Sequence, residues 1–409
     1  ALRREPSELI FPPSFTETQI RAALRPDQLA LVTFATAGGY HFFIVDQSSV
    51  QYTGFSKTRD LQRTVAKWLK QLGATEVTVD RKQVSDSEWK TTSKEIFDFL
   101  FAKIVAEQWD VTKELVVVPD GALWYLPFEA LLMGEGDQQN LLSEMVNIRY
   151  SPTVSLAFGG QRPITPADNL VAIASRLSPK TEIELTNSQY DQWIDPLPES
   201  IKFETFRHSS NLLGNQIDQL LDWSYIKATR GKALATVPIS IEKSNADNGS
   251  INAWMTLPWG APQHLILPGY QSPGITLKGR PPGIDMFLTT TSLMAAGSRS
   301  ILISRWNTAG KTAFQLTGNY ASSHQTDGIS KAIADSRKLV RETDLDSANE
   351  PRYRSKGDEP PIKTEHPFFW ASHMLLAVPD ATEPKIRPYK KQSNGPTRLA
   401  PGAGLPKVP

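Results

Sequence analysis

Residues 114–131, ELVVVPDGALWYLPFEAL, carry the pattern that decides the fold class. The apolar run after Glu114 predicts a fully buried strand, and Pro119-Asp120-Gly121 is a turn signal that ends it. A strand that is apolar on both sides must be covered on both faces, as in sheets with helices on either side. The stretch therefore predicts a central strand of an α/β fold.

The residues upstream of this strand support the same class. Two β-rich runs, 29–36 and 40–45, are joined by Ala37-Gly38-Gly39, which predicts a hairpin. Apolar residues at helical spacing then predict helices at 58–72 and 86–107. A hairpin followed by helices and a buried strand indicates an α/β layer architecture.

The second half of the chain alternates between strand and helix patterns. An alternation of this kind predicts a mainly parallel sheet with covered faces. The expected elements are a strand at 170–174, a helix at 211–222, strands at 232–237 and 263–267, a helix at 284–296 ending at Gly297, a strand at 300–304, helices at 309–323 and 328–341, and a closing aromatic-rich strand at 366–378.

Composition excludes several classes of function. The 44 Lys and Arg residues nearly balance the 43 Asp and Glu residues, which disfavours nucleic-acid binding by the whole chain. The chain has no cysteine, so thiol catalysis, disulfides and thiolate metal sites are excluded. It also lacks a metal-ligand motif and a phosphate-binding loop, so we expect neither a metal nor a cofactor.

The ends of the chain and its hydropathy suggest where it works. No apolar run approaches the ~20 residues that span a bilayer, so we expect a cytoplasmic protein without a membrane span. The first residues, ALRREP, suggest a processed chain or a segment of a longer one. Residues 381–409 are rich in Pro and Gly and hold six basic side chains against one acidic, a net charge of +5, which predicts a disordered basic tail.

A second stretch, residues 263–274 (QHLILPGYQSPG), marks the candidate site. The strand at 264–267 breaks into Pro268-Gly269, and Tyr270 stands just beyond the strand's carboxyl end. In open α/β sheets this is where ligands and catalytic groups lie. His264 lies within the strand, about 10 Å or more behind its end, too far to act as a general base for Tyr270 or Ser272.

Three blocks of sequence carry a family resemblance. They are residues 114–131, continued by VNIRYSPTVS at 146–155; SLMAAGSRSILISRW at 292–306; and HPFFWAS at 366–372. In this order they resemble the CHAT domain, a caspase- and separase-like fold of the clan CD peptidases that is found in bacteria, often beside TPR repeats. We expect Trp306 and Trp370 within these blocks to be core aromatics, and His366 to have a structural role.

The resemblance implies a caspase-like three-layer α/β sandwich in two halves, with mainly parallel sheets and flanking helices. Residues 1–158 would form a pseudo-protease half and residues 167–380 a protease half. A linker at 159–166 would join them, and the tail would begin at residue 381.

Active members of the family carry a His after one strand and a Cys nucleophile after its neighbour. In this chain Pro238, or alternatively Val237, stands at the expected position of the His, and Tyr270 stands at that of the Cys. Neither Pro nor Val can take a proton, and an unperturbed Tyr hydroxyl, with a pKa near ~10, is a poor nucleophile without a base. The resemblance therefore implies a degenerate site with no catalytic residue.

Three hypotheses about function follow. The first is a catalytically inactive pseudo-peptidase that serves as a protein-binding or scaffold module, with Ser240, Tyr270, Gln271 and Ser272 as possible cleft residues. Its partner would be a protein or peptide, with a TPR-containing segment of the same polypeptide as one candidate. The second is an active hydrolase in which a Ser or Tyr replaces the thiol. The third is a purely architectural domain of a large assembly.

Overall fold

The computed structural model describes two long parts of the chain and several short segments between them. They are residues 14–55, 57–101, 103–159, 263–268, 270, 281–308, 310–350, 352–357 and 359–379, together with five short strands between residues 170 and 236.

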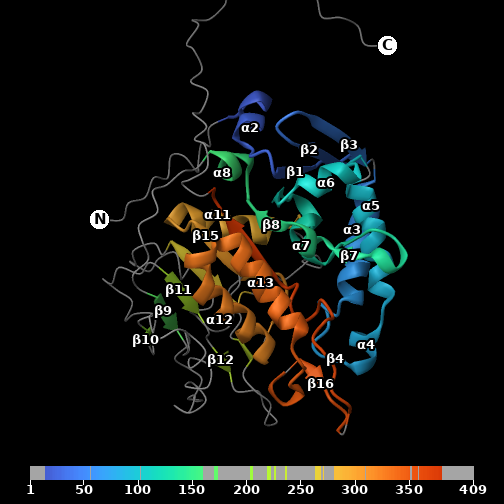
Figure 1. Cartoon of the computed structure of the whole chain (residues 1–409), viewed down its shortest axis with the longest axis vertical. Coiled ribbons are helices and arrows are strands. Elements are labelled where there is room, and N and C mark those ends of the chain that lie inside the picture. The colour runs from blue at the N-terminus through green and yellow to red at the C-terminus, as the bar shows by residue number, and fades with distance from the viewer. Residues whose placement is uncertain are drawn as a thin grey trace, which may run out of the picture.

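An 11-stranded sheet runs through the whole molecule (Figure 1). It draws strands from both halves of the sequence. From one edge to the other its strands are β10 (Phe203–Thr205), β9 (Leu170–Ile173), β11 (Gln219–Asp222), β14 (His264–Leu267), β15 (Ser300–Ser304), β17 (His373–Ala377), β8 (Asn147–Tyr150), β5 (Glu114–Val118), β1 (Gln28–Ala35), β2 (Tyr40–Val45) and β3 (Val50–Phe55).

Nine of these eleven strands form two parallel blocks that meet near the centre of the sheet, and β2 and β3 extend one edge as antiparallel strands. Strands β10, β9, β11, β14 and β15 are parallel to one another. Strands β17, β8, β5 and β1 form the second parallel block. The blocks join where β17 pairs antiparallel with β15. Because β17 lies between β15 and β8, the two predicted halves share one continuous sheet rather than forming two separate ones.

Helices cover the sheet on both faces. In β5, Leu115 and Val117 enter the main core, whereas Val116 and Val118 enter a second, smaller core. This alternation shows a strand buried on both faces, as the apolar run predicts. The helices are α2 (Glu17–Ala23), α3 (Thr58–Gln71), α4 (Arg81–Ser85), α5 (Glu88–Phe101), α6 (Ala106–Val111), α7 (Leu142–Met145), α8 (Val154–Phe158), α11 (Ile284–Ala296), α12 (Gly310–Asp327) and α13 (Ile329–Glu342). Helix α12 packs against α13, and α13 packs against β8 (Figure 1).

The remaining short elements lie in the connections. Two 3₁₀ helices, η1 (Gly121–Tyr125) and η2 (Phe128–Ala130), follow β5 directly. The short strands form the pairs β4 (Val79–Asp80) with β16 (Tyr353–Arg354), β6 (Leu132–Met133) with β7 (Asn140–Leu141), and β12 (Tyr225–Ile226) with β13 (Ala235–Thr236); two further 3₁₀ turns are η3 (Gly136–Gln138) and η6 (Ser347–Asn349).

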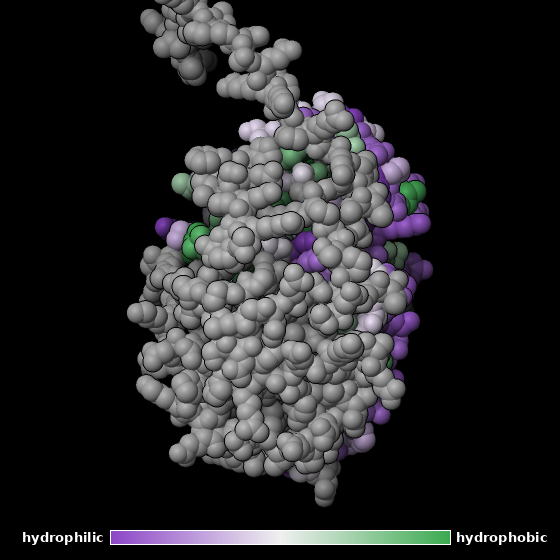
Figure 2. Space-filling view, turned by 90° about the vertical axis from the view of Figure 1, so that its left-hand side faces the viewer, coloured by the Kyte–Doolittle hydropathy of each residue, from purple (hydrophilic) through white to green (hydrophobic). Residues whose placement is uncertain are grey.

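On the side shown in Figure 2, the described residues that are visible lie mainly along the right-hand edge and near the top; most of them are hydrophilic, and the apolar ones appear in small separate patches. No described helix is both long enough and apolar enough to cross a membrane.

The predicted α/β class with a mainly parallel sheet and flanking helices is confirmed. Helix α11 and strand β15 have the predicted bounds, and Gly297 caps α11 as expected. Its φ of 126° lies in a region that residues with a Cβ rarely adopt. The hairpin of β1 and β2 is also confirmed.

One predicted element differs in its described part, and others are incomplete. Within the helix expected at 211–222, residues 219–222 form strand β11, because their backbone pairs with β9 on one side and β14 on the other; residues 211–218 lie outside the described residues. Such tertiary pairing overrides local helical spacing. Of the strand expected at 232–237, the described part is strand β13, which pairs with β12 in a separate ribbon.

The closing strand is shorter than predicted, because residues 366–372 form turns before β17 begins. The sequence prediction also missed β3. Residues 160–169 and 381–409, which include most of the predicted linker and the predicted tail, lie outside the described residues.

Candidate functional site

Tyr270 lies just beyond β14, where the sequence placed the lost nucleophile. Its backbone N–H donates to Leu267 O at 3.1 Å, which closes a turn directly after the strand. The side chain is 0% exposed and ranks among the largest fully buried side chains of the protein. Its hydroxyl is hydrogen-bonded to Thr289 Oγ1 of α11 at 2.9 Å. The phenol ring therefore points into the core and has a fixed polar partner.

The turn that carries Tyr270 is tied to the end of β15. The Ser304 hydroxyl donates to Tyr270 O, and also to Pro268 O at 3.1 Å. The Thr308 hydroxyl donates to the same Pro268 oxygen at 2.7 Å. These bonds satisfy the carbonyl groups that leave the sheet at this point, so the turn is fixed by buried hydroxyls.

The electrostatic surroundings keep the Tyr270 phenol neutral. Burial raises its pKa above the ordinary value, and the nearby Asp285 carboxylate raises it further. Asp285 is itself fully buried and accepts a hydrogen bond from the Tyr125 hydroxyl at 2.6 Å. Burial and the same carboxylate also raise the pKa of Tyr125. A phenol held in this state is not an activated nucleophile.

Two glycines allow the elements around Asp285 to approach closely. Gly283 N–H donates to the Tyr125 hydroxyl at 2.8 Å, and Gly283 has a φ of 82°. A Cβ on Gly283 would lie 2.3 Å from Gly121 O, which real contacts do not permit. The turn after β5 and the start of α11 are thus in backbone contact, and Tyr125 joins the first sequence block to the candidate site.

His264 cannot serve this site as a base. It begins β14, and its Nδ1 is 2.6 Å from the Ser300 hydroxyl at the start of β15. Its ring centroid lies 4.8 Å from that of His324. Burial, with His324 and Arg299 nearby, lowers the pKa of His264 to about 3. His264 thus stands at the start of β14, half-buried beside Ser300 and His324, whereas Tyr270 follows the other end of the strand.

The strand that the resemblance assigns to the base is described at Ala235–Thr236 alone. Sequence reasoning placed Pro238 or Val237 beside Tyr270 because the strand at 232–237 was expected next to β14. The neighbours of β14 are instead β11 and β15. The strand that lies beside β14 on the side away from β15 therefore ends at Asp222. Pro238, Ser240, Gln271 and Ser272 lie outside the described residues, so their place at the site stays a prediction.

A buried charged network, which sequence reasoning missed, joins the motif blocks. Glu129, within the first block, is 0% exposed. Its Oε2 lies 3.1 Å from Arg305 Nη2, and its Oε1 lies 2.9 Å from Arg337 Nη2. The Tyr150 hydroxyl donates to Glu129 Oε2 at 2.9 Å. A charged residue between Phe128 and Ala130, inside an apolar motif, was the signal that could have revealed it.

Arg305 and Arg337 also donate hydrogen bonds to the backbone at the third motif block. Arg305 Nη1 donates to Ala371 O at 3.1 Å, and Arg305 N–H donates to Ser372 O at 2.7 Å. Arg337 Nη2 donates to His373 O at 2.8 Å. The blocks that carry the family resemblance therefore meet in one buried polar cluster at the junction of the two parallel sheet blocks. Trp306 and Trp370, as predicted, are buried core aromatics.

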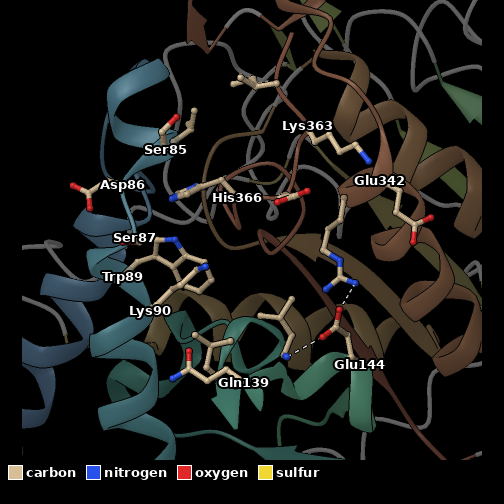
Figure 3. A pocket seen from close by; sticks show the side chains of 16 residues that line it. Ser85, Asp86, Ser87, Trp89, Lys90, Gln139, Glu144, Glu342, Lys363 and His366 are labelled. Atoms are coloured by element: carbon tan, nitrogen blue, oxygen red, sulfur yellow. Dashed lines mark hydrogen bonds and ion pairs between the residues drawn. The ribbon is translucent and has the colours of Figure 1, made fainter. Parts of the chain in front are cut away.

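A groove of about 770 Å³ lies away from the Tyr270 turn (Figure 3). Its walls come from the α4–α5 region, from the α7 region and from residues after α13. Trp89 and His366 meet edge to face in it, with ring centroids 5.8 Å apart. Burial lowers the pKa of His366 to about 4, and its Nδ1 accepts a hydrogen bond from Phe368 N–H at 3.2 Å. His366 is thus a neutral structural histidine, as predicted.

Within the described residues, no group of three or more His, Asp or Glu side chains could hold a metal ion. The buried Glu129 and Asp285 carboxylates are each bound by protein donors.

Comparison with known proteins supports the resemblance read from the motifs. Residues 90–202 match the family model of the CHAT domain, which confirms that prediction for a region that includes the first motif block. The second and third blocks lie outside the matched residues. No curated protein matches the sequence.

Two similar solved structures are crystal structures of the separase–securin complex of Saccharomyces cerevisiae. They are 10% and 9% identical in sequence to this chain, each with a TM-score of 0.48. The similarity covers 89% and 88% of this chain but only 30% and 31% of those chains. The chain thus spans less than a third of their length.

Proposed function

We propose that this chain is a catalytically inactive CHAT module that binds a protein or peptide partner. The observation that carries the proposal is the state of Tyr270. Tyr270 stands at the position of the expected nucleophile, and its phenol is fully buried and hydrogen-bonded to Thr289. Burial and the nearby Asp285 raise the pKa of this phenol. Reaction of this side chain with a substrate would require the turn after β14 to open.

The surrounding structure favours a retained scaffold over a replaced catalyst. The motif residues Glu129, Arg305 and Tyr150 make buried contacts that hold the sheet together. His264, a histidine near the candidate site in the sequence, is neutral and bonded to Ser300 at the other end of the strand. A module of this kind contributes a rigid surface rather than chemistry.

The partner and setting are part of the proposal. The similar separase structures contain a protein partner, securin. For this chain we propose a protein or peptide partner, with a TPR-containing segment of the same polypeptide as one candidate, in a bacterial cytoplasm. The predicted division into halves at residues 159–166 belongs to the same proposal.

Incubation of the protein with a diverse peptide library, followed by mass spectrometry, tests the absence of catalysis. The expected result is no new cleavage product relative to a sample without protein. The alternative, a hydrolase that uses Ser272 or Tyr270, predicts reproducible cleavage that Ser272→Ala or Tyr270→Phe abolishes. That outcome would overturn the proposal.

A further inference from the structure

A second groove, of about 670 Å³, runs between α7 and one face of α13, and we refer to it as the α7–α13 groove. The Glu144–Arg341 pair, joined at 2.6 Å, separates it from the groove in Figure 3, where a dashed line at Glu144 marks the contact. Both residues line both grooves. The α7–α13 groove is distinct from the Tyr270 turn and shares no lining residue with it.

The groove carries a surplus of positive charge. Five basic and two acidic side chains line it, which leaves three positive charges in excess. The basic side chains are Lys113, Lys331, Arg337, Lys338 and Arg341, and the acidic ones are Glu144 and Asp335.

Most of these charges already have partners within the protein. Arg341 is bound to Glu144, Lys331 to Asp335 at 2.5 Å, and Arg337 to the buried Glu129. The side chains that remain are Lys113, which precedes β5, and Lys338 on α13, whose Nζ is 4.0 Å from Glu342 Oε1 in an exposed pair. Exposed pairs of this kind contribute little, so both ammonium groups are available to a ligand.

An apolar contact lies beside these ammonium groups. Met145, at the end of α7, lines the groove and is 40% exposed. Methionine is a flexible, polarizable side chain that adapts to varied apolar partners. The groove is thus lined by ammonium groups from two different elements and by an exposed apolar side chain.

We propose that the α7–α13 groove binds an acidic linear peptide that places an apolar side chain against Met145 and carboxylates near Lys113 and Lys338. This inference rests on the proposed function, because it names the surface and the partner chemistry of a binding module. The chain's own residues 381–409 carry a net charge of +5 and have the wrong sign for this groove.

A nucleic acid fits the groove less well than an acidic peptide. Glu144 and Asp335 lie among the lysines and would face a row of phosphates. The whole chain has a formal net charge of only +1, which gives no extended basic surface. The two available ammonium groups match one or two carboxylates of a peptide better than a polyanion.

Fluorescence anisotropy with the full chain tests this proposal. The probe is a fluorescein-labelled peptide, Gly-Asp-Glu-Leu-Asp-Glu-Gly, and the comparison probes are Gly-Lys-Lys-Leu-Lys-Lys-Gly and a short oligothymidylate. We expect saturable binding of the acidic peptide, weaker at high salt, and little binding of the basic one.

Charge reversal at the groove provides the matched comparison. The double variant Lys113→Glu, Lys338→Glu should weaken acidic-peptide binding about tenfold or more, because attraction at two positions becomes repulsion. Lys67→Glu, at an exposed position of α3 far in sequence from the groove, makes half of this change of charge and should alter binding less than about twofold. Replacement of Met145 by Ser should weaken binding without changing its salt dependence.

Three outcomes would overturn the inference: no binding of the acidic peptide, equal loss with Lys67→Glu, or tighter binding of oligothymidylate that the groove variant abolishes. None of them depends on catalysis. Failure of the acidic peptide to bind would therefore leave the inactive-module proposal standing. Cleavage of the probe peptide would refute that proposal without bearing on peptide binding at the groove.

Discussion

The Glu129 network and the Tyr270 turn are both buried, but they are held by different kinds of polar groups. Around Glu129, a carboxylate, two guanidinium groups and a phenol hold three motif blocks together. Around Tyr270, the described contacts to the turn come from hydroxyl and backbone groups, and Asp285, the charged group among the described residues that raises its pKa, is bound to Tyr125. The contrast teaches that the motif blocks that resemble the CHAT domain stabilise the fold, while Tyr270, at the position where we expect the nucleophile, is a packed aromatic.

The largest expected effect comes from breaking the Glu129 network. Glu129→Gln would leave Arg305 and Arg337 buried without a countercharge, so we expect a loss of about 3–5 kcal/mol in the free energy of unfolding. Urea denaturation followed by circular dichroism measures it. Asp98→Asn, which breaks the exposed Lys94–Asp98 pair, should change stability by about 1 kcal/mol or less. Similar small losses for both variants would show that the network does not hold the two sheet blocks together.

A smaller effect is expected from the neutral histidine in the groove of Figure 3. Because burial lowers the pKa of His366 to about 4, the unfolded chain takes up a proton below pH ~6.5 and the folded protein does not until near pH 4. Stability from this group is thus present at neutral pH and is lost as pH falls through that window.

The corresponding test compares the wild-type protein with His366→Asn, whose amide can still accept from Phe368 N–H. Between pH 7 and pH 4.5 the wild type should lose about 2 kcal/mol more stability than the variant. Urea denaturation at both pH values gives the difference. An equal loss in both proteins would mean that His366 is not held neutral in the fold.

The smallest effect is expected at the candidate site itself. Tyr270→Phe keeps the ring but removes the hydroxyl bound to Thr289, so we expect a loss of about 0.5–1.5 kcal/mol. Thermal or urea denaturation measures it, with Thr289→Val as the partner in a double-mutant cycle. A coupling energy near zero would show that the two hydroxyls do not meet, and would weaken the view of Tyr270 as a packed core residue.

The sequence predicted the central elements because their signals are local. The apolar run before Pro119 reports a strand covered on both faces, and Gly297 marks the end of α11. The candidate turn at Tyr270 was found because it follows a short apolar strand. These features depend on neighbouring residues, which the sequence shows directly.

The remaining errors concern contacts between distant residues. Strand β11 lies in a stretch, 211–222, whose apolar residues also fit helical spacing, and only pairing with β9 and β14 makes its described residues a strand. The Glu129 network was missed because Arg305 and Arg337 lie far from it in sequence.

Covalent labelling with a fluorophosphonate tests most directly whether a reactive nucleophile survives near β14. The full chain is incubated with the probe, an active serine hydrolase is labelled in parallel as a positive control, and adducts are located by mass spectrometry. We predict no specific adduct, because the described site pairs Tyr270 with Thr289 and holds no neutral base beside it. An adduct on Ser272 or Tyr270 that disappears in Ser272→Ala or Tyr270→Phe would contradict this prediction and establish an active site.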